Sequence, residues 1–273
     1  MDKIYQVYQV SDSTGETLDR IFLAIKAQFS NFNCKTIHFS FTRTTNQIDN
    51  IISKCKKEKN VIILYTIVEN NFAKYLTEQC DKNKIPCFAV LGNLISDFSK
   101  LLKQDANRKP SGQHILDKEY YDRIEAVQFT MAHDDGKIIT DLNKSDIILV
   151  GASRTSKTPT SIYLANRGYK TTNIPIIPNK NLPQQLAETP KNVCVVGLIC
   201  DSSRLVDVRR NRIHSLNEDR PGEYTEEKKV IEEIENSKIL FKKNNWPVID
   251  VTRKAVEETA AAVIKIFDII NSK

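Results

Sequence analysis

The sequence predicts an α/β protein in which an N-terminal parallel-sheet domain precedes a C-terminal phosphate-loop (P-loop) kinase-like domain. In both halves of the chain, short apolar runs alternate with amphipathic helical stretches, a pattern typical of parallel strands covered by helices. Between the halves, the run Asn107–Gly112 contains a proline and a glycine that favour a turn or linker. We therefore expect domains at residues 1–105 and 123–273, joined by a linker at 106–122.

Four strands and four helices are expected in the first domain. The strands are the apolar runs Ile4–Val10, Thr36–Thr42, Val61–Ile67 and Cys87–Leu91, and the helices are Thr14–Phe29, Asn46–Lys57, Asn71–Asp81 and Leu94–Lys103. At the first helix start, Ser13 and Glu16 have the spacing of a capping box. An anion site at the same place, for phosphate or a phosphorylated target, is the functional alternative.

The second domain is expected to begin with a hairpin and to continue as an αβ unit. The run His133–Gly136 contains Asp-Gly, which favours a tight turn between two strands. The expected strands are Ala126–Met131, Lys137–Thr140, Asp146–Val150, Thr172–Ile177, Val193–Ile199 and Val248–Val251. The last helix carries one apolar stripe that is expected to pack on the sheet, formed by Val256, Ala260, Val263, Phe267 and Ile270.

Composition excludes several classes of protein. The 273 residues are 40% hydrophobic and 27% charged, and no apolar run approaches the roughly 20 residues of a membrane helix. The net charge of +6 is spread along the chain, which argues against nucleic acid as a partner. The six cysteines and four histidines lack metal-ligand spacing. The start of the chain resembles no signal peptide, so we expect a cytoplasmic protein.

A phosphate loop is the strongest chemical signal in the sequence. The pattern G-x-x-x-x-G-K-[ST] is met, apart from a serine at the second glycine, by Gly151, Ala152, Ser153, Arg154, Thr155, Ser156, Lys157 and Thr158. Backbone N–H groups of such a loop wrap a phosphate, the lysine adds a positive charge, and the threonine can bind Mg²⁺. The alternative is an ordinary strand-to-helix turn rich in helix-capping residues. The order of strand, loop and helix favours nucleotide binding.

These residues also resemble a known family. Gly151–Pro159, followed by Ser161–Ala165, is similar to the signature of the pyruvate, phosphate dikinase regulatory proteins. The likeness extends to Val10–Thr17, Arg123–Ala126, Phe129, His133–Gly136 and Asn173–Pro175, and so covers nearly the whole chain. The family's own signature has the serine that stands at position 156.

The resemblance implies a bifunctional enzyme. One activity uses ADP to phosphorylate a threonine beside the phospho-histidine of the dikinase and inactivates it. The other uses inorganic phosphate to remove that group as pyrophosphate. Related members act on phosphoenolpyruvate synthase, and the motifs leave open which target applies. A small-metabolite kinase and a nucleotide sensor without chemistry are the other hypotheses. The sequence also leaves the oligomeric state open, including a homo-oligomer.

The remaining candidate residues are acidic and basic side chains near predicted turns. His133, Asp134 and Asp135 are candidates at the phosphoryl acceptor, where a carboxylate can take the threonine proton or hold Mg²⁺ and a histidine can transfer protons. His133 and Asp134, with Lys157, are the candidate catalytic residues. The residues alone favour a plain hairpin turn over a catalytic role; the resemblance reverses this order for Asp134. Asp201, after an apolar strand, is a candidate Mg²⁺ ligand with Thr158, or a helix cap; Asp250 has a similar position. A target's phosphate could be held by Arg204, Arg209, Arg210 and Arg212, unless they form a solvated helix face.

Overall fold

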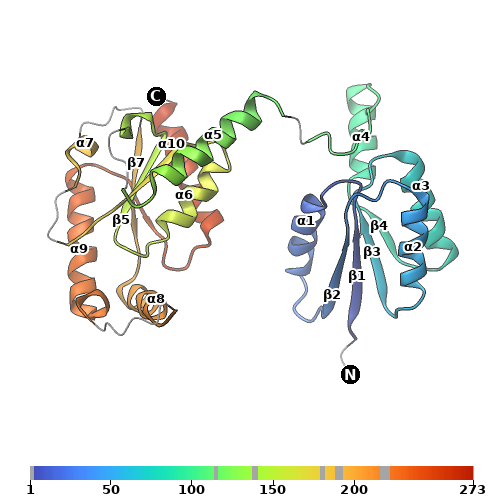
Figure 1. Ribbon diagram of the computed structural model, residues 1–273, viewed down its shortest axis with the longest axis horizontal. Coiled ribbons are helices and arrows are strands. Elements are labelled where there is room, and N and C mark those ends of the chain that lie inside the picture. Colours follow the sequence, from blue (N-terminus) through green and yellow to red (C-terminus); the bar gives the residue numbers. More distant parts are fainter. Residues whose placement is uncertain are drawn as a thin grey trace. The chain divides into compact units, whose positions relative to one another are not determined.

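The computed structural model describes residues 3–113, 116–136, 141–178, 182–187, 193–215 and 222–272. The chain divides into two compact units, residues 1–115 and 116–273, and each unit has its own parallel sheet (Figure 1). The predicted α/β class is confirmed. None of the helices in the described ranges combines the length and apolar character needed to cross a membrane.

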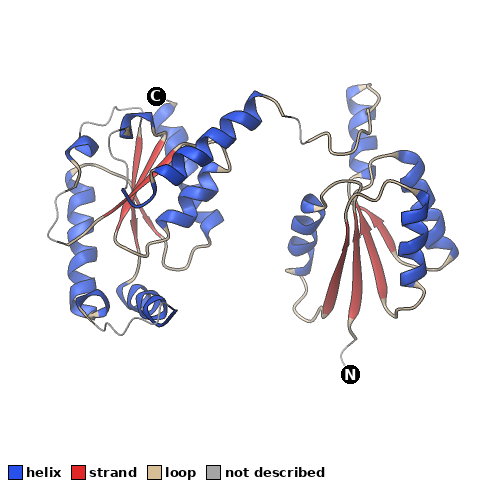
Figure 2. Cartoon of the chain, viewed as in Figure 1, coloured by secondary structure: helices blue, strands red, loops and turns tan. Residues whose placement is uncertain are grey.

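The first unit is a four-stranded parallel sheet in the order β2-β1-β3-β4, covered by helices on both faces (Figure 2). Its strands are β1 (Tyr5–Val10), β2 (Cys34–Phe39), β3 (Val61–Tyr65) and β4 (Cys87–Ala89), and its helices are α1 (Glu16–Lys26), α2 (Thr45–Cys55), α3 (Asn70–Lys82) and α4 (Gly92–Leu102). Successive residues of β1 serve opposite faces, because Val7 packs with α1 residues and Tyr8 packs with α2 and α3 residues.

The second unit repeats this strand order as β6-β5-β7-β8. Its strands are β5 (Ile147–Gly151), β6 (Thr171–Pro175), β7 (Cys194–Ile199) and β8 (Val248–Asp250). Its described helices are α5 (Lys118–Ala132), α6 (Lys157–Ala165), α7 (Gln184–Ala187), α8 (Ser202–Ser215), α9 (Glu227–Lys243) and α10 (Val256–Asn271), with short 3₁₀ turns η1 (Asp134–Gly136), η2 (Leu142–Lys144) and η3 (Glu223–Thr225).

Helices cover both faces of the second sheet. Ile147 and Leu149 pack on one face with α6 and α10 residues, among them the predicted stripe residues Ala260 and Val263. On the other face the ring of Phe241 in α9 lies against Gly197, where an added Cβ would come within 2.5 Å of the ring. A side chain at position 197 would therefore push α9 away from the sheet.

The strand order reverses at the same point of each sheet. From β1 the chain crosses to β2 on one side, and it returns to β3 on the other. In the second unit β5 is followed by β6 on one side and β7 on the other. Ligands of open parallel sheets bind where the order reverses, at the carboxyl ends of the strands. The segment after Gly151 lies at such a point.

The predicted hairpin around His133 is wrong. Residues 126–131 belong to α5, and 137–140 lie outside the described residues. The β-branched and aromatic composition of this run resembles a strand, but Asp117 caps the helix by accepting the N–H of Tyr120 at 2.9 Å. Ala126 and Thr130, four residues apart, form the buried side of the helix. Helical burial therefore prevails over local strand propensity.

Candidate functional site

The predicted phosphate loop connects β5 to α6 and depends on Gly151 at its first position. A Cβ on this residue would lie 2.6 Å from the carbonyl oxygen of Leu198 in β7 and 2.8 Å from Thr155 Oγ1. The loop therefore turns directly against the neighbouring strand. Thr155 Oγ1 donates to the carbonyl of Ala152 at 2.9 Å and closes the turn from inside.

Two residues of the loop have left-handed backbone conformations. Arg154 has φ of 71°, and Ser156, which replaces the usual glycine, has φ of 60°. A serine can adopt a left-handed conformation, although at a cost in free energy. Ser156 therefore does not prevent the loop from forming. Among the described residues, none accepts a hydrogen bond from the backbone N–H groups of residues 153–157. Unpaired N–H groups before a helix start are suited to an anion.

Lys157 is buried within the loop, with 5% of its surface exposed. Its Nζ donates to the carbonyl of Ala152 at 2.8 Å. Burial lowers the pKa of Lys157 to about 8, while the negative charges of Asp135, Glu233 and Asp134 act in the opposite direction. An anion arriving at the loop would stabilise the protonated form of this lysine.

Asp134 and Asp135 of η1 reach the same place but have different surroundings. Asp134 Oδ1 accepts from Thr158 Oγ1 at 2.9 Å and also forms a short hydrogen bond with Asn173 Nδ2. Asn173 is buried in β6, and its Oδ1 accepts the N–H of Asp135 at 3.0 Å. The Asp135 carboxylate is exposed and accepts no hydrogen bond from the described residues, and it supplies the largest charge effect on Lys157.

His133 has a structural environment. Its side chain is 5% exposed, its Nδ1 lies 2.8 Å from the carbonyl of Phe129, and its ring stacks on the Phe129 ring at 3.9 Å. Nε2 has no hydrogen-bond partner in the described part of the chain. No hydrogen bond or ion pair between described residues joins His133 to the loop, whereas Asp134 accepts a hydrogen bond from Thr158.

Asp201 acts as a helix cap. Its Oδ1 accepts from Ser203 Oγ at 2.6 Å and from the N–H groups of Ser203 and Arg204 at 3.0 and 3.3 Å. The hydroxyl of Ser203 lowers the pKa of Asp201. Asp250 likewise accepts the N–H of Thr252 at 2.9 Å. Within the described ranges no hydrogen bond joins Asp201 to Thr158, and no group of three His, Cys, Asp or Glu side chains is placed to hold a metal ion.

Comparison with known proteins identifies the family. A family model described as "Kinase/pyrophosphorylase" matches residues 7–264. The chain belongs to this family. The resemblance found from the sequence is thereby confirmed, and membership makes the protein a phosphoryl-transfer enzyme.

Relatives within the family match over nearly the whole chain. A Pelagibacter ubique protein is 58% identical over 269 residues, which cover 98% of each chain. A Caulobacter vibrioides protein is 43% identical over 96% of this chain and 82% of its own, and a Rhizobium meliloti protein is 42% identical over 95% of each. All three bear the name "Putative pyruvate, phosphate dikinase regulatory protein". Among solved structures, GanP, a glucose-galactose binding protein from Geobacillus stearothermophilus, covers 99% of this chain and 92% of its own at 15% identity with a TM-score of only 0.24.

The structure brings further residues to the candidate site, whose position there the sequence analysis did not predict. Asn173 joins Asp134 to β6. It belongs to the stretch Asn173–Pro175 that the resemblance includes, but the sequence analysis gave it no role. Arg209 was grouped with exposed arginines, but it is 1% exposed and pairs with Glu233, whereas Arg204, Arg210 and Arg212 are exposed. Neither Glu233 nor Tyr224, which also touches the loop, belongs to any recognisable motif.

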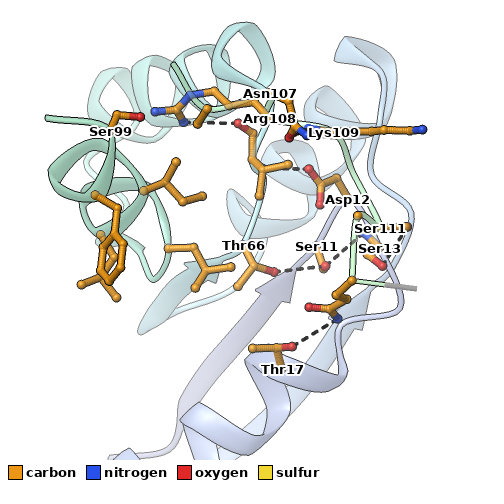
Figure 3. A pocket seen from close by; sticks show the side chains of 18 of the residues that line it. Ser11, Asp12, Ser13, Thr17, Thr66, Ser99, Asn107, Arg108, Lys109 and Ser111 are labelled. Carbon is orange, nitrogen blue, oxygen red and sulfur yellow. Dashed lines mark hydrogen bonds between the residues drawn. The ribbon is translucent and has the colours of Figure 1, made fainter. Parts of the chain in front are cut away.

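The first unit has its own pocket, of about 580 Å³, at the carboxyl ends of β1 and β3 (Figure 3). The predicted capping box is wrong, because the N-cap residue of α1 is Gly15, with φ of 90°, and no side chain caps the helix. Ser13 Oγ instead accepts from Ser111 Oγ at 2.9 Å. Burial raises the pKa of Asp12, which lines the pocket. The anion site proposed for this helix start stays a prediction.

Proposed function

We propose that this enzyme transfers a phosphoryl group from ADP to a threonine of pyruvate, phosphate dikinase and removes it again with inorganic phosphate. Three findings support the proposal. The family is described by both a kinase and a pyrophosphorylase activity, the relatives bear the dikinase regulator's name, and the loop after β5 has the residues of an anion site. We expect the dikinase to be recognised in its phospho-histidine form.

The observation that carries the proposal is the position of Lys157. Its ammonium group lies inside a loop whose N–H groups at 153–157 have no acceptor among the described residues. Such a cradle suits the diphosphate of ADP, since it presents peptide dipoles and one buried cation to the same anion. Displacing the Ala152 carbonyl from Nζ would free the lysine to bind a phosphate oxygen.

Mg²⁺ would be held most directly by Thr158 and Asp134. Their side chains already meet through a hydrogen bond of 2.9 Å, and a hydroxyl with a carboxylate is an oxygen donor set that Mg²⁺ accepts. The ion would neutralise charge on the phosphates during transfer. Asp201, the Mg²⁺ ligand proposed from the sequence, is engaged as a helix cap and would need to release α8 first.

Asp135 is better placed than Asp134 to serve as the base. It is exposed, its carboxylate accepts no hydrogen bond from described residues, and it interacts electrostatically with the charge of Lys157. We propose that it takes the proton of the target threonine as the oxygen attacks the β-phosphorus of ADP and AMP leaves. In the opposing reaction an oxygen of inorganic phosphate attacks the phosphothreonine phosphorus. The bond from phosphorus to the threonine oxygen breaks, Asp135 returns the proton to that oxygen, and the pyrophosphate formed is released.

The decisive experiment combines the enzyme, Mg²⁺ and ADP labelled in its β-phosphate with histidine-phosphorylated dikinase. Labelled phosphothreonine on the dikinase is expected with the wild type. It should be lost with Lys157→Met and retained with Lys265→Met, whose lysine is exposed on α10. Parallel reactions with phosphoenolpyruvate synthase identify the target. No transfer to either protein would refute the proposed function, and transfer from ATP to a small metabolite would favour the other kinase hypothesis.

A further inference from the structure

Arg209 of α8 is the bulkiest of the fully buried side chains in the described part of the chain. A guanidinium keeps its charge at all physiological pH values, so its burial requires partners. Glu233 of α9 forms a bidentate ion pair with the guanidinium: Nη1 lies 2.8 Å from Oε2, and Nη2 donates to Oε1 at 3.0 Å. The ion pair thus ties α8 to α9 behind the phosphate loop.

The same guanidinium reaches the loop itself. Nη2 also donates to the carbonyl of Ser153 at 3.1 Å, and Nη1 donates to the carbonyl of Tyr224 at 3.1 Å. The Tyr224 ring lies 4.5 Å from the guanidinium carbon, and its hydroxyl lies 3.1 Å from Ser153 Oγ. Ser153 is therefore held at its backbone by Arg209 and at its side chain by Tyr224.

These contacts determine the direction of one peptide group. The C=O and N–H of a trans peptide point in opposite directions. Since the carbonyl of Ser153 points toward Arg209, the N–H of Arg154 points away from α8. This N–H makes no hydrogen bond to a described residue, and it belongs to the stretch that precedes the start of α6.

We propose that Arg209, together with Glu233 and Tyr224, is a positioning unit that orients the Arg154 N–H toward the diphosphate of the bound nucleotide. The inference rests on the proposed function, because it names residues that prepare the same site for ADP. None of the three needs to touch the ligand. They act through the peptide between Ser153 and Arg154, and the ion pair keeps this peptide oriented before the ligand arrives, which preserves affinity.

A double variant separates positioning from folding. Arg209→Met alone would leave the Glu233 carboxylate buried without a partner and destabilise the fold. Arg209→Met with Glu233→Met replaces the whole ion pair by apolar side chains, an exchange that is often neutral or stabilising. We expect a urea midpoint equal to or above that of the wild type, together with ADP binding weaker by roughly tenfold or more.

Calorimetric titration with ADP and the amide resonance of Arg154 test the inference. In the wild type this resonance should shift on addition of ADP, and in the double variant the shift should disappear. Tyr224→Phe leaves the ion pair in place and should weaken ADP binding severalfold. Tyr163→Phe, which removes a hydroxyl on α6 bonded to Arg167, is the matched control and should bind ADP as the wild type does.

The outcomes distinguish the two proposals. If the wild type binds no ADP, the proposed function fails and the inference fails with it. If the wild type binds ADP and the folded double variant binds it equally well, the inference alone is wrong. If the double variant does not fold, Tyr224→Phe tests the inference instead. An ADP affinity and an ADP-induced shift of the Arg154 amide resonance that both equal those of the wild type would then overturn the positioning role.

Discussion

Replacing Lys157 with methionine should stabilise the free protein while abolishing its affinity for ADP. The side chain is almost fully buried, and burial lowers its pKa from 10.5 to about 8. A tenfold change in a protonation equilibrium is worth about 1.4 kcal/mol, so keeping Lys157 charged costs the folded state about 3 kcal/mol. Methionine fills a similar volume and carries no charge, so this cost disappears.

The stability difference between the wild type and Lys157→Met should depend on pH, because Lys157 has different pKa values in the folded and the unfolded state. Below pH 8 the lysine is protonated in both the folded and the unfolded state, and the full cost is present. Between pH 8 and 10.5 the unfolded chain binds more protons than the folded protein, so the stability of the wild type rises with pH relative to the variant. The advantage of Lys157→Met should therefore be about 3 kcal/mol at pH 7 and should vanish near pH 10.5.

Urea unfolding at 25 °C measures this difference, with fluorescence of the single tryptophan as the probe. Trp246 packs beside Phe241 in the second unit, so its signal reports on the unit that contains the loop. About 3 kcal/mol corresponds to a shift of about 1 M or more in the urea midpoint. A Lys157→Met variant that is no more stable at pH 7, or whose advantage does not change with pH, would refute the assignment of a destabilised buried charge. Lys265→Met provides the comparison.

Three further predictions concern the same site. Gly151→Ala should lower the free energy of unfolding by about 1 to 3 kcal/mol and abolish ADP binding, because its Cβ would lie 2.6 Å from a carbonyl oxygen; urea titration and calorimetry report both effects. Asp135→Asn should reduce phosphoryl transfer by roughly 10²-fold or more with little change in ADP affinity, whereas Asp134→Asn should weaken the Mg²⁺ dependence of binding; equal effects of the two variants would contradict the separate roles. Asp201→Ala should lower the urea midpoint through loss of the α8 cap and leave the Mg²⁺ requirement unchanged, and a raised Mg²⁺ requirement in the transfer assay would restore Asp201 as a metal ligand.

The sequence was sufficient for most elements because their apolar residues repeat with the period of a strand or a helix. The stripe containing Ala260 and Val263 is such a case, and both residues are buried as expected. The strand predicted for residues 126–131 is wrong because the composition of these few residues favours a strand, whereas the helix that they form depends on a cap nine residues upstream, at Asp117. The capping box predicted at Ser13 is wrong for the opposite reason: the local motif is present, but the Ser13 hydroxyl accepts a hydrogen bond from Ser111, which is distant in the sequence.

The amino-acid sequence by itself determined the parallel αβ pattern, the family resemblance and the loop from Gly151 to Thr158, because each is encoded in residues adjacent along the chain. Only the tertiary structure decided which acidic residue accepts a hydrogen bond from Thr158, which one accepts none from the described residues, and that Arg209 is buried against the loop. Those contacts join segments 24 to 56 residues apart. Their geometry follows from how the helices pack on the sheet, and no local periodicity records it.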